Sequence, residues 1–246
     1  MTDLKSVSVC RINNSFGCSG GRKFAVNFLD KTLHKYGDFM ESYKTIKFEA
    51  CDEFVEKRSR FIGYSKPVTT QEQAIEFINQ IKSKHWDATH NVYAYVLREG
   101  SIMRYSDDGE PQGTAGVPVL DVLVKSELCD IVVVVTRYFG GILLGGGGLV
   151  RAYSHGSRIA AQAGKIITMA KCAVCSVFCS YSQYGKVNTT VIANGGIIDD
   201  TIYTDAVEID FHIPPENIGS LNKQLADATG GECAVQIIDE IFCELD

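Results

Sequence analysis

Hydrophobic positions in the first part of the chain follow strand patterns, interrupted by helical stretches. Residues 43–68 predict two or three strands with a turn near Lys57–Arg60, and residues 92–105 predict a hairpin that turns at Glu99–Gly100. Ile131–Val135 is an unbroken β-branched run, which is typical of a strand buried on both faces. The stretch from Tyr105 to Tyr153, which contains this run, is the part around which we expect the chain to be organised.

Apolar residues at helical spacing predict three helices in this part. Thr69 followed by Glu72 fits a capping box, and the apolar face of the helix that follows consists of Ala74, Phe77, Ile78 and Ile81. Pro118 suits the first turn of a short helix that runs through Leu123. The third helix ends at Gly164, and its predicted buried face consists of Leu149, Ala152, Tyr153, Gly156, Ile159, Ala160 and Ala163.

A different pattern follows Gly164. Strands are predicted over Cys172–Tyr181, Ile197–Tyr203, Ala206–Ile213 and Cys233–Cys243, with helices over Gln183–Ala193 and from Pro214 to about Ala228. The order βαββαβ is that of the ferredoxin-like split motif. We therefore expect an α+β chain with a domain over residues 40–166 and a second over residues 167–246.

The charge is unevenly divided between these two parts. The composition, 45% hydrophobic and 22% charged, is ordinary for a globular protein, and no apolar run approaches the ~20 residues that a membrane span needs. From residue 167 onward, three basic side chains accompany 12 acidic ones, a net charge of −9, which leaves +3 of the total of −6 for the first 166 residues. A nucleic-acid surface would lie on the first part, because the second would repel phosphate.

The nine cysteines are odd in number, and no secretion signal accompanies them. This favours reduced thiols and a cytoplasmic location. On a strand, Cys172 would point away from Cys175 and Cys179, so we expect packing cysteines rather than a metal cluster. Residues 1–39 are weakly patterned, and they are either a flexible extension or sequence upstream of a true start at Met40.

Two groups of glycines follow the buried run and precede the third helix, namely Gly140 and Gly141, then Gly145, Gly146, Gly147 and Gly148. A buried strand, a glycine loop and a helix N-terminus together expose backbone N–H groups to an anion. Tight packing of the loop on a sheet explains the glycines equally well. Neither G-x-x-x-x-G-K-[ST] nor G-x-G-x-x-G is present, so we expect no nucleotide cofactor.

Basic residues surround these glycines. Arg137 stands where the buried run ends, and it either binds phosphate bidentately or neutralises the Asp107–Asp108 turn. On the third helix, one polar stripe consists of Arg151, His155, Arg158, Gln162 and Lys165. This stripe is either a nucleic-acid contact or a solvated helix face.

Asp107, Asp108 and Glu110 crowd together at a strand end. They could bind a divalent cation or act as acid and base. The structural alternative, which we favour, is a turn whose carboxylates cap the next segment or pair with Arg137 or Arg151. His85 and His90 are spaced poorly for one helical face, so we expect them to pack rather than bind a metal.

The motif SDDGEPQGTAGVPVLDVL, followed by VVVVTRYFGGILLGGGGLVRAYS, closely resembles the YigZ/IMPACT family, in its two-domain bacterial type. The resemblance covers about residues 41–164. The matching positions are Asp107, Asp108, Gly109, Glu110, Gly113, Thr114, Arg137, Tyr138, Gly140, Gly141, Arg151 and Tyr153. Gly146 departs from the family pattern, which has Thr or Ala there, and the resemblance assigns no catalytic residue.

The resemblance implies a two-layer α/β first domain, like a small-subunit ribosomal protein and elongation factor G domain IV. It implies a second domain like elongation factor G domain V. Eukaryotic relatives act in translational control through a protein partner, and fold analogy suggests an RNA or ribosome partner for the bacterial type. From the resemblance and the charge division, we expect a cytoplasmic, non-enzymatic protein that binds RNA or the ribosome through its first domain. The alternatives are a small-anion or metal-dependent enzyme that uses the acidic cluster, and a protein-interaction module.

Overall fold

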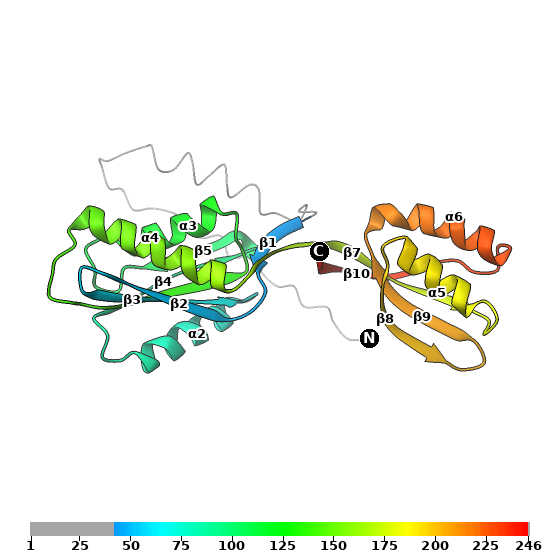
Figure 1. The fold of residues 1–246 in the computed structure, drawn as a ribbon, viewed down its shortest axis with the longest axis horizontal. Helices are drawn as coiled ribbons and strands as arrows, with labels where there is room; N and C mark the ends of the chain where they lie inside the picture. Colours follow the sequence, from blue (N-terminus) through cyan, green and yellow to red (C-terminus); the bar gives the residue numbers. More distant parts are fainter. Residues whose placement is uncertain (1–41, 246) are drawn as a thin grey trace, which may run out of the picture. The chain divides into compact units, whose positions relative to one another are not determined.

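The computed structural model describes residues 42–245, so the predicted extension over residues 1–39 lies outside the described residues. Within residues 42–245, the chain forms two five-stranded sheets and five α-helices (Figure 1). All strand pairs in both sheets are antiparallel. This confirms the mixed α+β class.

The first sheet has the strand order β2-β3-β6-β4-β5. Its strands are β2 (Ala50–Glu56), β3 (Ser59–Pro67), β4 (His90–Leu97), β5 (Ile102–Ser106) and β6 (Ile131–Tyr138). The predicted turn near residue 57 and the hairpin that turns near residue 99 are both present. Ile131–Val135 is fully buried in the middle strand, which confirms the strand predicted from its β-branched run.

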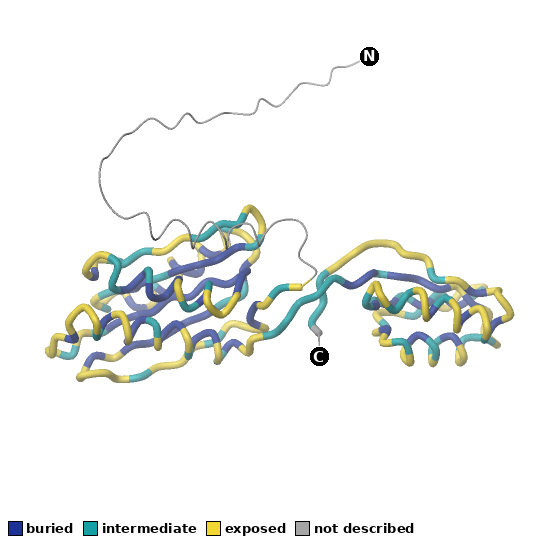
Figure 2. Tube along the Cα trace, turned by 90° about the horizontal axis from the view of Figure 1, so that it is seen from above, coloured by how far each residue is buried: buried dark blue, intermediate teal, exposed yellow. Residues whose placement is uncertain are grey.

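Helices cover both faces of this sheet (Figure 1). The helix α2 (Gln71–Lys84) packs on one face with Val132 and Val134 of β6, whereas α3 (Gly116–Lys125) and α4 (Gly146–Ala163) pack on the other. The expected two-layer arrangement is therefore wrong, because β3, β4 and β6 carry apolar side chains on both faces and each face needs a helical cover. Figure 2 shows that buried residues are concentrated in the strands, whereas the helices have buried residues along one side only.

Two details of the helices differ from the predictions. The N-cap of α2 is Thr70, whose hydroxyl accepts from the Gln73 amide, while Gln73 Oε1 accepts from the Thr69 amide. The cap thus lies one residue after the Thr69 expected, because Gln73 can take the role given to Glu72. The face of α2 is as predicted, with Ala74, Phe77, Ile78 and Ile81 all buried.

The buried face of α4 also differs in part from the prediction. Ile159 and Ala163 are only half-buried, while Ser157 and Ala161 are buried in their place. The Ser157 hydroxyl donates to the Val119 carbonyl of α3, and this bond explains how a serine enters the core. The face is rotated toward α3, a neighbour that helical spacing alone does not reveal.

The second sheet is built from β1 (Ser42–Ile46), β7 (Ile166–Cys179), β8 (Ile197–Tyr203), β9 (Val207–Ile213) and β10 (Gln236–Leu245). Its order is β1-β7-β9-β8, with β10 on β7. The helices α5 (Tyr184–Ala193) and α6 (Ile218–Thr229), the latter preceded by a 3-10 turn at Pro215–Asn217, pack on one face through Val187, Val191, Leu221 and Leu225. The predicted element order βαββαβ is present from β7 to β10.

The cysteines depart from the expectation of reduced thiols. Cys172 on β7 and Cys243 on β10 form a disulfide, with Cα atoms 6.2 Å apart and a sequence separation of 71. Cys175 and Cys179 are free and buried on the other face of β7, as strand alternation predicts. Strand pairing brings Cys172 and Cys243 together, and the sequence does not disclose that pairing. Between residues 42 and 245, no helix is long and apolar enough to cross a lipid bilayer.

Candidate functional site

Backbone geometry explains three of the glycines in the loop from β6 to α4. A side chain on Gly140 would collide with the backbone of Arg58 and Ser59, because the loop lies directly against the β2–β3 turn, and the Gly140 amide donates to the Ser59 hydroxyl at 3.2 Å. Gly141 and Gly145 have φ angles of 83° and 74°, which favour glycine. Packing thus accounts for this part of the glycine pattern.

Gly146 and Gly147 start α4 and are not explained by packing, whereas a side chain at Gly148 would lie 2.9 Å from Leu144 Cβ. A side chain at Gly147 would meet nothing within 4 Å, and one at Gly146 would only touch Thr114 at 4.0 Å. Gly145 supplies no side-chain cap, and the first amides of an α-helix have no partner within the helix. The exposed N-terminus of this 18-residue helix therefore offers N–H groups and the positive end of its dipole to solvent.

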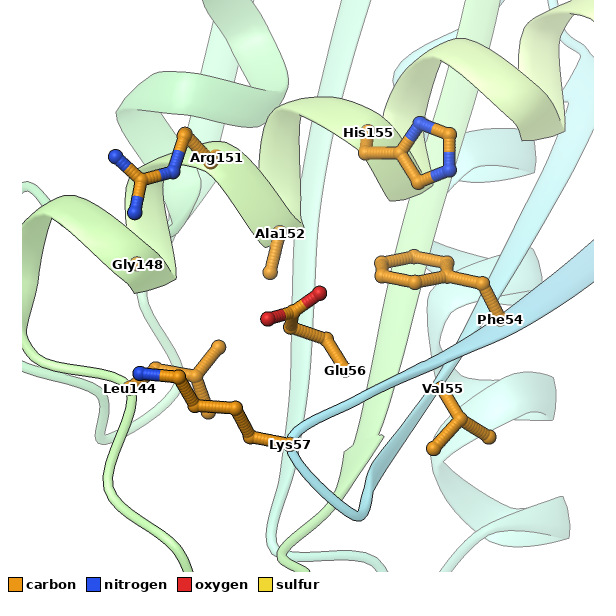
Figure 3. A pocket seen from close by; sticks show the side chains of 9 residues that line it. All are labelled: Phe54, Val55, Glu56, Lys57, Leu144, Gly148, Arg151, Ala152 and His155. Atoms are coloured by element: carbon orange, nitrogen blue, oxygen red, sulfur yellow. The ribbon is translucent and has the colours of Figure 1, made fainter.

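A pocket of about 440 Å³ lies between this end of α4 and the β2–β3 turn (Figure 3). The side of α4 that lines it carries Gly148, Arg151, Ala152 and His155, and the opposite wall carries Phe54, Val55, Glu56, Lys57 and Leu144. Figure 3 shows the Glu56 carboxylate pointing toward α4, Lys57 extending from the turn beside Leu144, and the Arg151 guanidinium directed away from Glu56. Two cations, a histidine and a single carboxylate therefore line this pocket at separate places.

The cations of this pocket have no counterion among the residues that the structure describes. Neither Lys57 nor Arg151 forms an ion pair with any residue between 42 and 245. The His155 ring packs edge-on against Phe54 with centroids 4.5 Å apart, and it remains exposed. The pocket therefore has a net positive charge. Glu56 is its one carboxylate, and it would compete with an external anion for the cations.

The predicted basic stripe is exposed as expected, but its residues do not share one site. Arg151, His155, Arg158, Gln162 and Lys165 are all exposed. Arg158 lines a separate depression of about 380 Å³ between α3 and α4, together with residues such as Val117, Val122 and Val150. Arg151 and His155 therefore line one depression and Arg158 lines another, on different sides of α4.

Arg137 does not face solvent, so of its two expected roles phosphate binding is wrong, and its ion pair is with Glu110 rather than with Asp107 or Asp108. The residue is 5% exposed, and its Nη1 donates to Glu110 Oε1 at 2.6 Å. The rings of Phe61 and Phe139 lie 5.5 Å and 5.4 Å from the guanidinium carbon. The chain's own carboxylate and aromatic rings thus occupy the position proposed for an anion.

Tyr153 of α4 completes this buried cluster. Its hydroxyl donates to the same Glu110 Oε1 at 2.7 Å, and His90 Nε2 lies 3.8 Å from that oxygen. Burial, followed by the nearby Glu110 charge, raises the pKa of Tyr153 well above its ordinary value. Tyr153 therefore stays a neutral donor, and the cluster joins α4 and β6 to the acidic turn.

The three acidic residues have separate structural partners. Asp107 accepts from the amides of Gly113, Ala115 and Gly116 at 2.7–3.1 Å, which holds the start of α3. Asp108 accepts from Lys82 at 2.6 Å and from the Asn91 amide at 2.7 Å. Residues 42–245 contain no group of three or more His, Cys, Asp or Glu side chains suited to a metal ion.

The histidines also have packing partners. His90 Nδ1 lies 2.8 Å from the Asp108 carbonyl, and His85 lies between the hydroxyls of Tyr64 and Tyr138. These contacts account for both histidines without a metal.

Sequence reasoning missed Lys57 and Phe54 as site residues. The turn near Lys57 was predicted, and its run of basic residues through Arg60 was a usable signal. Its position beside α4 was not predictable, because it depends on the sheet order that places β2 at the edge next to β3.

Comparison with known proteins places this fold in a family. Residues 57–161 match the Impact N-terminal domain, and residues 177–232 match a domain of unknown function, DUF1949. The "IMPACT family member YvyE" of Bacillus subtilis is 36% identical over 198 residues, which cover 80% of this chain and 91% of that protein. The "IMPACT family member YigZ" of Escherichia coli is 33% identical over 189 residues, 75% of this chain and 92% of that protein.

Eukaryotic proteins and a solved structure are similar as well. The "Protein IMPACT homolog" of Dictyostelium discoideum is 42% identical over 105 residues, which are 41% of this chain and 29% of that protein. A solved structure described as "Crystal structure of an hypothetical protein" is 31% identical with a TM-score of 0.52, and the match covers 82% of this chain and 99% of that one. The chain therefore belongs to the IMPACT family.

Proposed function

We propose that this protein binds RNA, free or within the ribosome, through the pocket between the β2–β3 turn and α4. The observation that carries the proposal is that Lys57 and Arg151 line one pocket and that neither forms an ion pair with residues 42–245. Buried or paired cations serve structure, as Arg137 does, whereas unpaired cations in a concave site are available to phosphate.

The rest of the pocket fits a phosphate chain. An arginine binds phosphate oxygens in a bidentate manner, and the first amides of α4 add donors at the same end of the pocket. The exposed ring of His155 offers a surface on which an unpaired base can stack. These features favour single-stranded or looped RNA over a duplex.

The architecture supports the same proposal by analogy. We propose that residues 40–166 form a domain of the elongation factor G domain IV type and residues 167–246 a ferredoxin-like domain. The match over residues 57–161 and the strand order β10-β7-β9-β8 support these assignments. A protein that works on RNA or the ribosome in translational control would act in the cytoplasm. The acidic turn does not support an enzymatic function as a second candidate. Asp107, Asp108 and Glu110 each accept a hydrogen bond from another residue of the protein.

The test is fluorescence anisotropy with a labelled RNA hairpin that carries a single-stranded loop, measured over a series of salt concentrations. Arg151→Ala and Lys57→Ala should each weaken binding and lower the salt slope by about 0.7 per lost contact with a single strand. Lys186→Ala, an exposed lysine on α5, is the matched control. The proposal fails if the wild-type chain does not bind, or if all three variants bind as the wild type does.

A further inference from the structure

The second sheet has one face that no helix of residues 42–245 covers. The helices α5 and α6 pack against the odd-numbered side chains of β7 and β9. The opposite face, which we call the outer face, carries Val174, Ser176 and Phe178 of β7, Glu208, Asp210 and His212 of β9, and Ile197, Asp200 and Ile202 of β8. Figure 1 shows both helices on the other side of this sheet.

The centre of the outer face is acidic. Asp200 and Asp210 are directly opposite each other on β8 and β9, an arrangement in which two carboxylates repel. Glu208 stands two residues along β9 and forms no ion pair with the described part of the chain. The one histidine of this face, His212, is already held by Asp199 at 2.8 Å.

One carboxylate oxygen at this centre has no partner. Asp210 Oδ1 is shielded from solvent and accepts no hydrogen bond from residues 42–245. The neighbouring Ser176 on β7 is only 2% exposed, so this spot is already desolvated. A shielded, unpaired carboxylate oxygen is costly, and a cationic donor from outside would relieve that cost.

Apolar side chains flank the acidic centre along the strands. Phe178 and Ile202 lie two residues to one side, exposed by 45% and 42%, and Ile197 lies to the other side, exposed by 52%. On β8 the face is apolar, acidic and apolar at Ile202, Asp200 and Ile197, with the two-residue spacing broken by a bulge between Ile198 and Asp200. An extended segment that lies along the strands repeats its side chains with the same spacing.

We propose that the outer face binds an extended basic segment of another protein, one with a Lys or Arg between apolar residues at every second position. The cation would donate to Asp210 and lie between it and Asp200, while the apolar residues would cover Ile202 and Ile197, which flank Asp200 on β8. RNA is disfavoured because the carboxylates repel phosphate. A second copy is disfavoured because a twofold contact through this face would bring two acidic centres together.

The experiment is an NMR titration of the full chain with a synthetic peptide in which valine, arginine and valine alternate with serines. Amide shifts should change on β7, β8 and β9, and Asp210→Asn should weaken binding at least tenfold. Asp227→Asn, on the exposed side of α6, removes the same charge and should change affinity less than twofold. A second peptide with glutamate in place of arginine should not bind.

Four results would overturn the proposal. Equal weakening by Asp210→Asn and Asp227→Asn would indicate attraction by net charge alone. Shift changes confined to α5 and α6, or binding of an RNA oligonucleotide to the outer face, would assign a different occupant. A dimer in sedimentation velocity that Phe178→Ser dissociates would identify the outer face as a contact between copies. Because RNA binding is proposed for the first sheet, its failure leaves this test unaffected.

Discussion

Arg137 and Glu110 form a buried ion pair beside the first sheet, where the guanidinium Nη1 lies 2.6 Å from Glu110 Oε1. The two side chains are 6% and 3% exposed. An ion pair so deeply buried has lost its hydration. Removing either partner therefore leaves an uncompensated buried charge, which strongly destabilises the folded protein. The Arg137 position in the family motif therefore has a structural reason that requires no ligand.

Replacement of Arg137 by alanine should lower the free energy of unfolding by about 3–5 kcal/mol, because the buried Glu110 would lose its cationic partner. Urea denaturation followed by circular dichroism measures this loss. The exposed Arg158→Ala variant should stay within about 0.5 kcal/mol of the wild type. The double variant Arg137→Met/Glu110→Leu should be more stable than Arg137→Ala. A stable Arg137→Ala variant with lost RNA binding would contradict this structural role.

His85 should make stability depend on pH. Its Nε2 lies 2.7 Å from the Tyr64 hydroxyl and its Nδ1 2.9 Å from the Tyr138 hydroxyl, which donates to Asp87. Tyr138 therefore accepts from Nδ1–H, and a neutral ring satisfies both contacts. Burial, and then the charge of Lys84, lowers the pKa of His85.

The sign of this effect follows from proton binding. As the pH falls below about 6.5, the unfolded chain binds a proton on His85 before the folded chain does, so the free energy of unfolding decreases. His85→Gln should be less stable at neutral pH but should lose less stability on acidification. Urea denaturation at a series of pH values provides the measurement, and parallel curves for the two proteins would refute the assignment.

Gly140 in the β6–α4 loop and Gly147 in the first turn of α4 should respond in opposite ways to alanine. Gly140→Ala should lower the free energy of unfolding by about 1–3 kcal/mol, since the new methyl group would collide with the Arg58 backbone. Gly147→Ala should raise it by up to about 0.5–1 kcal/mol, because the position is helical and open. Thermal unfolding compares the two. A Gly147→Ala variant that is more stable yet binds RNA less tightly would show that the ligand approaches this part of the helix closely.

Glu56 is the carboxylate that competes with an anion in the pocket. Glu56→Gln should strengthen RNA binding by about fivefold, since a nearby like charge opposes phosphate by about 1 kcal/mol. Fluorescence anisotropy at low salt measures the gain, which should shrink as salt screens the charge. The control is Glu76→Gln, which removes an exposed carboxylate from α2 on the opposite side of the sheet. Equal gains in both variants would point to overall charge rather than to the pocket.

Residues with a local signal were predicted well. The β-branched run of β6 and the apolar spacing of α2 identify buried faces, because burial on a strand or helix leaves a periodic pattern in the sequence. Thr70 was missed by one position because Thr69 and Thr70, and likewise Glu72 and Gln73, offer the same capping chemistry. Such errors are small, since either residue starts the helix in the same place.

Residues whose role depends on a distant partner were not predictable. The sequence offers several carboxylates as ion-pair partners for Arg137. The packing of α4 and β6 around Glu110 determines which one pairs with it and excludes solvent from the pair. Lys57 becomes part of a pocket only because β2 lies beside α4. Cys172 and Cys243 likewise meet only through the pairing of β7 with β10.

The sequence by itself determined the strands, the helices, the glycine-rich motif that marks the family and the separation of charge between the two parts. These properties are local or additive, so each can be read from residue type and spacing. Tertiary structure alone decided which cations are paired inside the protein and which stay open to a ligand. That choice depends on desolvation and on contacts between residues far apart in sequence, and both exist only once the sheets and helices have packed.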